Sequence, residues 1–267
     1  MITQVEFSLL KADTKKPLKM VLDESQFSQK HILNHFQNNS IYEPETFLAF
    51  EHILKAGDTF IDVGTHIGFF SLVASRMVGD SGKVLSFELN PTNYAHLLTH
   101  MNINVIRNIL PHNWAVADKS GPTEFYNNTD NDGGHSLWDC GKHEFNEKSR
   151  KSPEIRPAYC VALDDYIEAA NVRLIKIDTE GAEVSVISGM KQLLQRCKPV
   201  VIAEINDFGL SQMGTNQEEM RNIMSDLGYE CWVLGLPKPT KLNNGERFNS
   251  QDVYNVLFTT NPEDVIK

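Results

Sequence analysis

The sequence predicts an α/β protein whose seven-stranded, mostly parallel sheet carries helices on both faces. Three observations support this fold class. Short apolar runs alternate with segments of helical periodicity, the runs end in glycine or acidic residues, and the composition is that of an ordinary globular chain. With 267 residues, of which 41% are hydrophobic, the chain is long enough to bury a large core.

Residues 1–40 are polar and weakly patterned, and we expect them to form a cap on the main domain. Within this cap, residues 5–9 and 19–22 have the alternation of two paired strands, and residues 28–36 have the character of a short helix. The main domain is expected to span residues 41–267.

The first half of the main domain alternates between helical and strand-like segments. Helical spacing marks residues 45–54, 69–77 and 92–102, and short apolar runs mark strands at residues 59–63, 83–87 and 114–117. Units of strand, helix and strand form right-handed crossovers, so these runs predict parallel neighbours in one sheet.

The second half continues the alternation after an interruption. Strands are predicted at residues 173–177, 199–203, 229–234 and 253–258, and helices at residues 184–195 and 215–227. Thr215 and Glu218 have the spacing of a capping box at the start of the last helix. Residues 121–157 are rich in Asn, Asp, Gly and Ser, and they predict an insertion near the ligand face with a hairpin around residues 123–126.

The charge balance argues against nucleic acid as a partner. The chain has 25 Lys plus Arg against 35 Asp plus Glu, a formal net charge of −10. Such a chain repels phosphate backbones unless a basic patch overrides the charge, and the densest basic run, residues 148–151, is short.

The cysteines and the apolar runs favour a cytoplasmic protein. None of the four cysteines forms a C-x-x-C pair, so a structural zinc site or redox motif has no support. The first residues lack the pattern of a signal peptide, and no apolar run approaches the roughly 20 residues that span a bilayer.

A glycine loop follows the first strand of the main domain. Asp62, Gly64 and Gly68 form a D-x-G-x-x-x-G pattern that opens a helix, whose free N–H groups suit an anion or a carboxylate. An ordinary strand-to-helix turn is the alternative. Glu88 ends the next strand, 20 residues past Gly68, where an acidic residue in doubly wound folds accepts hydrogen bonds from ribose hydroxyls. The pair favours a nucleoside ligand, and a solvated carboxylate is the alternative for Glu88.

A second acidic segment follows the strand at residues 173–177. Asp178 lies at the strand end, where ligands bind in open α/β sheets. Glu180 and Glu183 have a structural alternative, since acidic residues in a first helical turn are favoured by the helix dipole. Lys176 alternates onto the same face as Asp178, and a lysine in so apolar a strand predicts an ion pair.

Together these segments resemble the FkbM-type methyltransferase family. The resemblance rests on residues 62–68, 115–118, 175–183 and 42–45 and on Glu88 and Glu204, with the K-I-D-x-E-G-x-E string its most specific part. It covers about residues 42–204. It implies a class I, Rossmann-like methyltransferase fold, S-adenosylmethionine as methyl donor, and O-methylation of a hydroxyl on a sugar, glycan or natural product.

The resemblance also implies roles for single residues. Asp62, Gly64 and Gly68 would line the methionine part of the donor, Glu88 would bind its ribose, and Ala115, Val116 and Asp118 would approach the adenine. The family commonly has Ala-Asn where this chain has Thr65 and His66, and His66 is able to hydrogen-bond the donor's carboxylate. Asp178 would lie near the transferred methyl group.

Methyl transfer to an alcohol calls for a base or a metal, because an alcohol is a poor nucleophile until it loses its proton. Asp178, His135 and Glu204 are the candidate bases. An exposed loop histidine is the alternative for His135, which lies in the insertion. We predict no dedicated metal ligands, with a divalent cation between Asp178 and Glu204 as the alternative.

Two other functions share the predicted architecture. A nucleotide-dependent oxidoreductase is weakened by the missing G-x-G-x-x-G loop, and a non-catalytic nucleoside-binding module would need no base. The partners expected are a small-molecule or glycan acceptor, with no nucleic acid and no membrane span. No pattern in the sequence predicts an oligomeric state.

Overall fold

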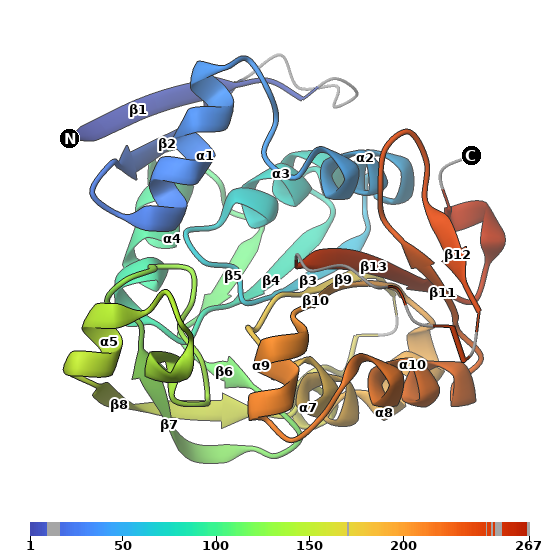
Figure 1. Cartoon of the computed structure of the whole chain (residues 1–267). Coiled ribbons are helices and arrows are strands. Elements are labelled where there is room, and N and C mark those ends of the chain that lie inside the picture. The colour runs from blue at the N-terminus through green and yellow to red at the C-terminus, as the bar shows by residue number, and fades with distance from the viewer. Residues whose placement is uncertain (10–16, 170, 244, 247, 249–252, 266–267) are drawn as a thin grey trace.

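The computed structural model describes residues 1–9, 17–169, 171–243, 245–246, 248 and 253–265 (Figure 1). Its central sheet has eight strands in the order β12-β11-β13-β10-β9-β3-β4-β5. Five neighbouring strands are parallel: β10 (Val200–Ile205), β9 (Val172–Ile177), β3 (Thr59–Val63), β4 (Lys83–Phe87) and β5 (Ile109–His112). The α/β class is confirmed.

The other end of the sheet is mixed. β13 (Tyr254–Thr259) runs antiparallel to β10 and to β11 (Glu230–Val233), and β12 (Thr240–Leu242) pairs antiparallel with β11. The expectation of seven strands is therefore corrected to eight. The additional strand, β12, has three residues, too short to show an alternating pattern in the sequence.

The third predicted strand of the main domain, at residues 114–117, is not part of the central sheet. β5 (Ile109–His112) takes the edge of the sheet, and its Pro111 is a residue that strands tolerate at an edge. The predicted run at residues 114–117 contains only β6 (Ala115–Val116), which belongs to a separate sheet of order β6-β8-β7. β7 (Gly121–Asn127) and β8 (Glu154–Val161) pair antiparallel at the two ends of the insertion.

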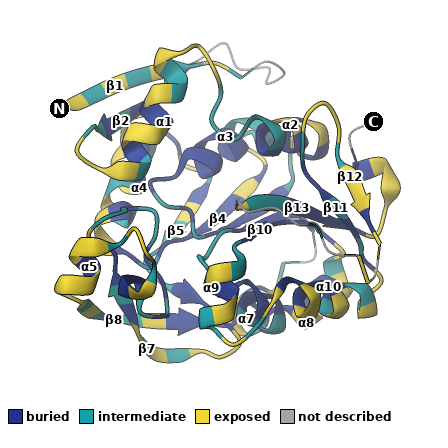
Figure 2. Ribbon diagram, viewed as in Figure 1, coloured by how far each residue is buried: buried dark blue, intermediate teal, exposed yellow. Residues whose placement is uncertain are grey.

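Helices cover both faces of the central sheet (Figure 1). One face carries α2 (Pro44–Ile53), α3 (Phe69–Val78) and α4 (Pro91–Ile103), and the other carries α7 (Glu183–Ser188), α8 (Lys191–Cys197) and α10 (Gln217–Asp226). The shorter helices are α5 (Glu147–Lys151), α6 (Leu163–Tyr166), α9 (Asp207–Gln212), η1 (Cys140–Lys142) and η2 (Pro262–Asp264). Figure 2 shows the buried residues concentrated in the sheet and in the helix faces turned toward it.

Two helix predictions needed correction. The helix predicted at residues 184–195 is divided into α7 and α8 at Gly189 and Met190. A Cβ on Gly189 would lie 2.0 Å from the carbonyl oxygen of Ala117, so the backbone approaches β6 closely at this break. The N-cap of α10 is Asn216, whose side chain accepts from the Glu219 backbone at 2.9 Å, and not Thr215.

The N-terminal segment forms the expected hairpin and helix. β1 (Ile2–Phe7) pairs antiparallel with β2 (Leu18–Asp23), and α1 (Phe27–Gln37) follows. Leu18, Met20 and Leu22 are buried in the same apolar cluster as α2 and α3. Among the described residues, no helix is both long enough and apolar enough to cross a membrane.

Candidate active site

A cleft opens at the carboxyl ends of β3, β4, β9 and β10. Its walls come from the glycine loop, the segment around β6, the insertion and the first helix. The predicted site residues that line it are Gly64, His66, Glu88, Ala115, Val116, His135, Asp178 and Glu204. Those that do not line it are Asp62, Thr65, Gly68 and Asp118. Asp118 is exposed and accepts from the Ser185 hydroxyl at 3.0 Å, so its contact is structural.

The buried Asp62 carboxylate stabilises the glycine loop. This carboxylate is buried and accepts hydrogen bonds from the hydroxyls of Thr65 at 2.8 Å and Ser71 at 2.5 Å. Gly64 has φ +80°, and a Cβ there would lie 1.8 Å from the carbonyl oxygen of Asp178. The loop therefore packs against the end of β9 with no room for a side chain.

Glu88 links the glycine loop to the start of α4. One carboxylate oxygen accepts from the His66 backbone at 2.8 Å, and the other accepts from the Asn90 backbone at 2.9 Å. Burial raises the pKa of Glu88 to about 7, because the charged form loses its hydration. The Glu88 carboxyl group is thus held in a fixed position, and it gains or loses its proton near neutral pH.

The predicted ion pair of Lys176 is present. Its Nζ donates to Asp178 Oδ2 at 2.5 Å, and the lysine side chain is only 3% exposed. Burial opposes the charge on Lys176, but the carboxylates of Asp178, Glu43 and Asp62 outweigh it and raise its pKa. Lys176 is therefore a fixed cation beneath the floor of the cleft.

Glu204 lies on β10 beside this pair. Within the described part of the chain, its buried Oε2 has no hydrogen-bond partner. Burial, followed by the charges of Asp178 and Glu180, raises its pKa well above the ordinary value of a glutamate. A neutral carboxylic acid with a free oxygen is able to hydrogen-bond a ligand in the cleft.

His135 is buried, so the alternative of an exposed loop histidine is wrong. Its Nδ1 accepts from the Asn128 backbone at 3.0 Å, and burial lowers its pKa to about 4. The neutral ring then carries its proton on Nε2. This arrangement makes His135 a hydrogen-bond donor toward the cleft and a weak proton acceptor.

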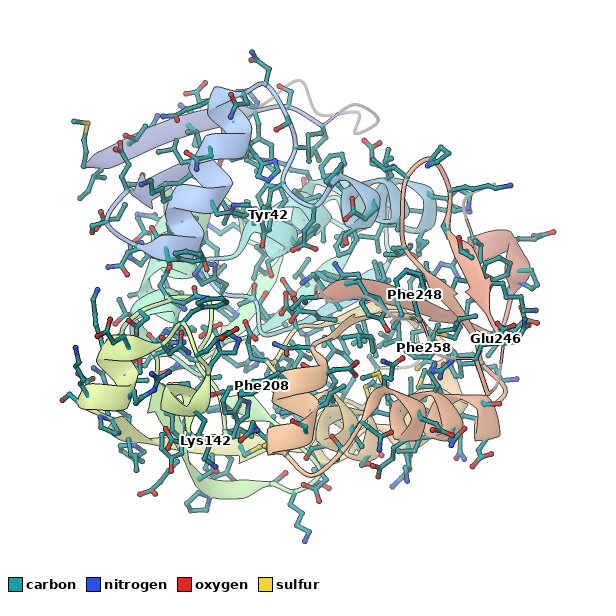
Figure 3. The ribbon with its side chains drawn as sticks, in the orientation of Figure 1. Tyr42, Lys142, Phe208, Glu246, Phe248 and Phe258 are labelled. Atoms are coloured by element: carbon teal, nitrogen blue, oxygen red, sulfur yellow. The ribbon has the colours of Figure 1, made fainter. Side chains whose placement is uncertain are left out.

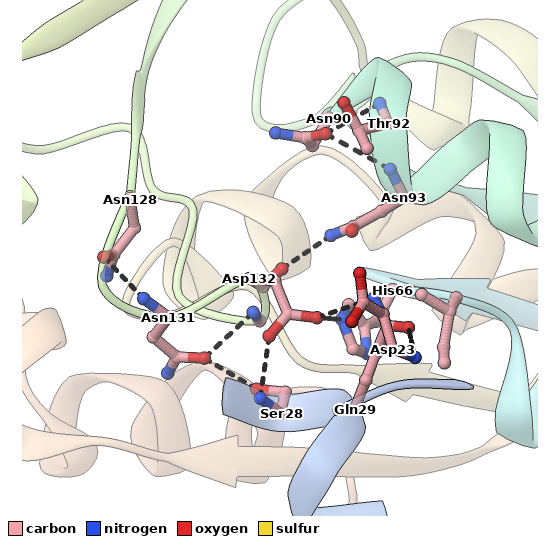
Figure 4. A network of polar contacts seen from close by, with 12 residues as sticks. Asp23, Ser28, Gln29, His66, Asn90, Thr92, Asn93, Asn128, Asn131 and Asp132 are labelled. Atoms are coloured by element: carbon pink, nitrogen blue, oxygen red, sulfur yellow. Dashed lines mark hydrogen bonds and ion pairs between the residues drawn. The ribbon is translucent and has the colours of Figure 1, made fainter. Parts of the chain in front are cut away.

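Sequence reasoning missed Asp132, which ties three segments together beside the cleft (Figure 4). Its carboxylate contacts His66 Nε2 at 3.0 Å and accepts from the Ser28 backbone at 2.7 Å. Its backbone oxygen accepts from Asn93 Nδ2 at 2.7 Å. Burial opposes ionisation, but the hydrogen bond and charge of His66 lower the pKa of Asp132 overall. Asp132 thus connects the insertion to the glycine loop, α1 and α4.

We expect Asp132→Ala to lower the free energy of unfolding by about 1–3 kcal/mol, because it leaves buried donors without an acceptor. It should also speed trypsin cleavage within the insertion. Asp139→Ala is the matched control, since, among the described residues, the only hydrogen bond that the structure gives the Asp139 carboxylate comes from the nearby Gly141 backbone. Equal denaturation midpoints and cleavage rates for the two variants would contradict the bridging role.

Tyr42 and Glu43 bring a further segment to the site. Tyr42 lines the cleft, and Glu43 accepts from Asn255 Nδ2 at 3.0 Å. Glu43 has φ +45°, an uncommon backbone conformation for a residue with a side chain. Burial raises the pKa of both groups.

The described residues contain no group of three His, Cys, Asp or Glu side chains arranged to hold a metal ion. The alternative considered above is a divalent cation between Asp178 and Glu204. One oxygen of that site, Asp178 Oδ2, contacts the Lys176 ammonium group.

The sheet order, the glycine loop and the carboxylate at the end of β4 are typical of doubly wound α/β folds that bind a nucleoside. Residues 62–231 match the family model described as the methyltransferase FkbM domain. The chain belongs to the FkbM methyltransferase family, and S-adenosylmethionine is its methyl donor.

Three of the solved structures to which the chain is similar are the following. The FkbM methyltransferase of Methylobacillus flagellatus KT is 15% identical with a TM-score of 0.45, and the match covers 86% of this chain and 53% of that one. A putative rRNA methylase of Clostridium thermocellum is 12% identical with a TM-score of 0.48, covering 81% and 95%. A putative methyltransferase of Streptococcus mutans, in complex with SAH, is 11% identical with a TM-score of 0.46, covering 81% and 94%. At these identities, the functions in those names do not transfer to this chain.

The residues of the cleft fit the donor. Glu88 presents a carboxylate suited to ribose hydroxyls, and the apolar side chains of Ala115 and Val116 line the wall beside it, where an adenine ring would pack. Gly64 and His66 also line the cleft, and Gly64 packs against the Asp178 backbone, on the side where the methionine end would fit.

Proposed function

We propose that the protein is an O-methyltransferase that transfers a methyl group to a hydroxyl of a sugar, glycan or natural-product acceptor. The observation that carries the proposal is the Asp178 carboxylate. It lines the cleft directly beside the glycine loop and is held by the buried Lys176 ammonium group at 2.5 Å. A fixed carboxylate at this position is suited to receive a hydroxyl proton.

The donor supplies an electrophilic methyl group on a sulfonium. The chain's own task is to hold the acceptor oxygen in line with that methyl and to exclude water. Asp178 accepts the hydrogen bond of the acceptor hydroxyl, which aims a lone pair at the methyl group. As the new C–O bond forms, the methyl–sulfur bond would break with its electron pair left on sulfur, and the hydroxyl proton, made strongly acidic, passes to Asp178.

Lys176, Glu204 and His135 support this step without taking the proton. Lys176 fixes the carboxylate by its 2.5 Å contact. Glu204 in its neutral form and His135 through Nε2–H are hydrogen-bond donors that line the cleft, and each is able to bind an oxygen of the acceptor.

We also propose that residues 41–267 form one catalytic domain, that residues 1–40 form its cap, and that the protein acts in the cytoplasm. The net charge of −10 supports a neutral acceptor over a nucleic acid.

The proposal is tested by measuring SAH release from S-adenosylmethionine with a panel of neutral hydroxyl-bearing acceptors, and methylated carbon–oxygen bonds are then identified by mass spectrometry. Calorimetric titration with NAD in parallel tests the oxidoreductase alternative. Tight binding of S-adenosylmethionine without SAH release by any acceptor would favour the nucleoside-binding module instead.

The raised pKa of Glu88 predicts that binding of the donor depends on pH. The ribose hydroxyls donate to its ionised form, and the pKa of about 7 in the free protein means that acid removes this acceptor. We expect the affinity for SAH to rise from pH 6 to pH 8, by up to about tenfold per pH unit below the pKa. Calorimetry in buffers of different ionisation enthalpy should show proton release on binding at pH 6.5.

The control is Glu88→Gln, which should bind SAH more weakly and with a flatter pH profile. An affinity that stays constant between pH 6 and pH 8 in the unmodified protein would rule out Glu88 as the ribose ligand.

A further inference from the structure

A second cleft lies on the outer side of the insertion. It is bounded by the start of α1, the insertion and the start of α9. The side chains that line it and that matter here are aromatic rings and amides: Phe27, Trp138, His143, Phe145, Asn146 and Asn206.

The rings form a continuous row from the interior to the surface. Trp138 meets Phe208 edge-on at 5.6 Å between ring centroids, Phe208 meets His143 edge-on at 5.0 Å, and His143 lies 5.5 Å from Phe145. Figure 3 shows Phe208 between α9 and the insertion. Phe145 is 77% exposed and Phe208 is 38% exposed, whereas Trp138 is buried. Exposed rings gathered at a cleft are typical of a binding surface.

Glu180 joins this second cleft to the cleft of the candidate active site, because it lines both. Two contacts hold it there. Trp138 Nε1 donates to the Glu180 backbone oxygen at 2.6 Å, and Asn206 Nδ2 donates to Glu180 Oε2 at 3.0 Å. The innermost ring of the row is thus anchored to the turn that follows Asp178.

The charge of the second cleft selects against anionic ligands. The Asp130 carboxylate lines it, and the described lining residues include no lysine and no arginine. Burial, followed by the charge of Asp178, raises the pKa of Glu180, the other acidic residue of the lining, to about 8. A phosphate-bearing chain such as RNA would meet the Asp130 carboxylate with no compensating cation in the lining. Rings flanked by amides are suited to a neutral ligand that has both apolar C–H faces and hydroxyl groups, which is the chemistry of a sugar.

From this geometry we infer that the acceptor is a neutral oligosaccharide, and that the second cleft binds the sugar units adjacent to the one that is methylated. The inference rests on the proposed function, and it narrows the acceptor from any hydroxyl compound to a glycan of at least two units. Phe27 and Phe145, the exposed rings that line the second cleft, stack on these units, and Glu180 lies at the junction between the two clefts.

The test measures binding of neutral oligosaccharides of one to four units to the SAH-saturated protein, by saturation-transfer NMR and calorimetry. Affinity should increase from one unit to two or more. Phe27→Ala and Phe145→Ala should each weaken the longer ligands by about tenfold, with little effect on a single sugar, because both rings line the second cleft. Tyr159→Ala is the control, because Tyr159 is an exposed ring that lines neither cleft.

Binding that does not depend on length, no binding of any oligosaccharide, or equal affinities in the Phe145 and Tyr159 variants would overturn the inference. Tight binding of an apolar ligand without hydroxyl groups, in place of the oligosaccharides, would also overturn it. The proposed function fails separately, if oligosaccharides bind through Phe145 but no acceptor leads to SAH release.

Discussion

Asp178→Asn is expected to lower kcat by about 10²- to 10⁴-fold, the range by which a positioned general base contributes to a rate. The amide oxygen still accepts a hydrogen bond from Lys176, and Glu43 and Asp62 remain near that cation, so the fold should persist. Single-turnover methyl transfer measures the loss. The Kd for SAH should change by less than about threefold, because Asp178 acts on the acceptor.

Glu204→Gln provides the matched comparison. Glutamine has the shape of the neutral acid that the raised pKa of Glu204 describes, so we expect kcat to fall by no more than about threefold. The opposite pattern, with an inactive Glu204 variant and an active Asp178 variant, would transfer the role of base to Glu204. His135→Gln should retain much of the activity for a related reason, since its Nδ1 already accepts from Asn128.

Gly64→Ala is expected to cost more than about 3 kcal/mol of stability and to abolish SAH binding. The new Cβ would lie 1.8 Å from the Asp178 carbonyl oxygen. The Cβ is bonded directly to the Gly64 backbone and the oxygen belongs to the Asp178 backbone, so neither atom moves away without displacing the main chain. The Gly64 N–H also donates to Phe87 at 2.9 Å, so displacement of the loop breaks its link to β4. Chemical denaturation and calorimetry measure the two effects.

Gly228→Ala tests the cost of placing a side chain in the left-handed backbone conformation without the steric clash that Gly64→Ala introduces. Gly228 has φ +85°, close to the +80° of Gly64, and a Cβ there would meet no atom within 4 Å. It should therefore cost only the about 1–2 kcal/mol of a left-handed residue and leave SAH binding unchanged. Equal losses in both variants would show that conformation, and not the approach of β3 to β9, sets the requirement for glycine.

The parts of the site that the sequence predicted are those with a local periodic signal. Lys176 lies on β9, and Asp178 follows directly after the strand, so the alternation of side chains was enough to place them together. The same holds for Gly64 and Glu88, which follow adjacent parallel strands. The roles assigned to these residues stay predictions.

Other parts of the site and fold arise from contacts between distant segments. Asp132 contacts His66 and Ser28 over 66 and 104 residues, and Glu43 meets Asn255 over 212 residues. Such pairs leave no trace in local periodicity. The misplaced third strand has a local cause, because the proline in β5 weakens the strand signal while Trp114, Ala115 and Val116 strengthen it nearby.

The position of β13 between β10 and β11 sets an order of assembly during translation. Until residues 254–259 leave the ribosome, the edge of β10 has no partner on that side, and β11 has no place in the sheet. Asn255, the residue that holds Glu43, arrives with the same strand. The nascent chain therefore carries an open sheet edge and an incomplete carboxylate cluster until β13 has been synthesised, and closing the sheet also completes the cluster.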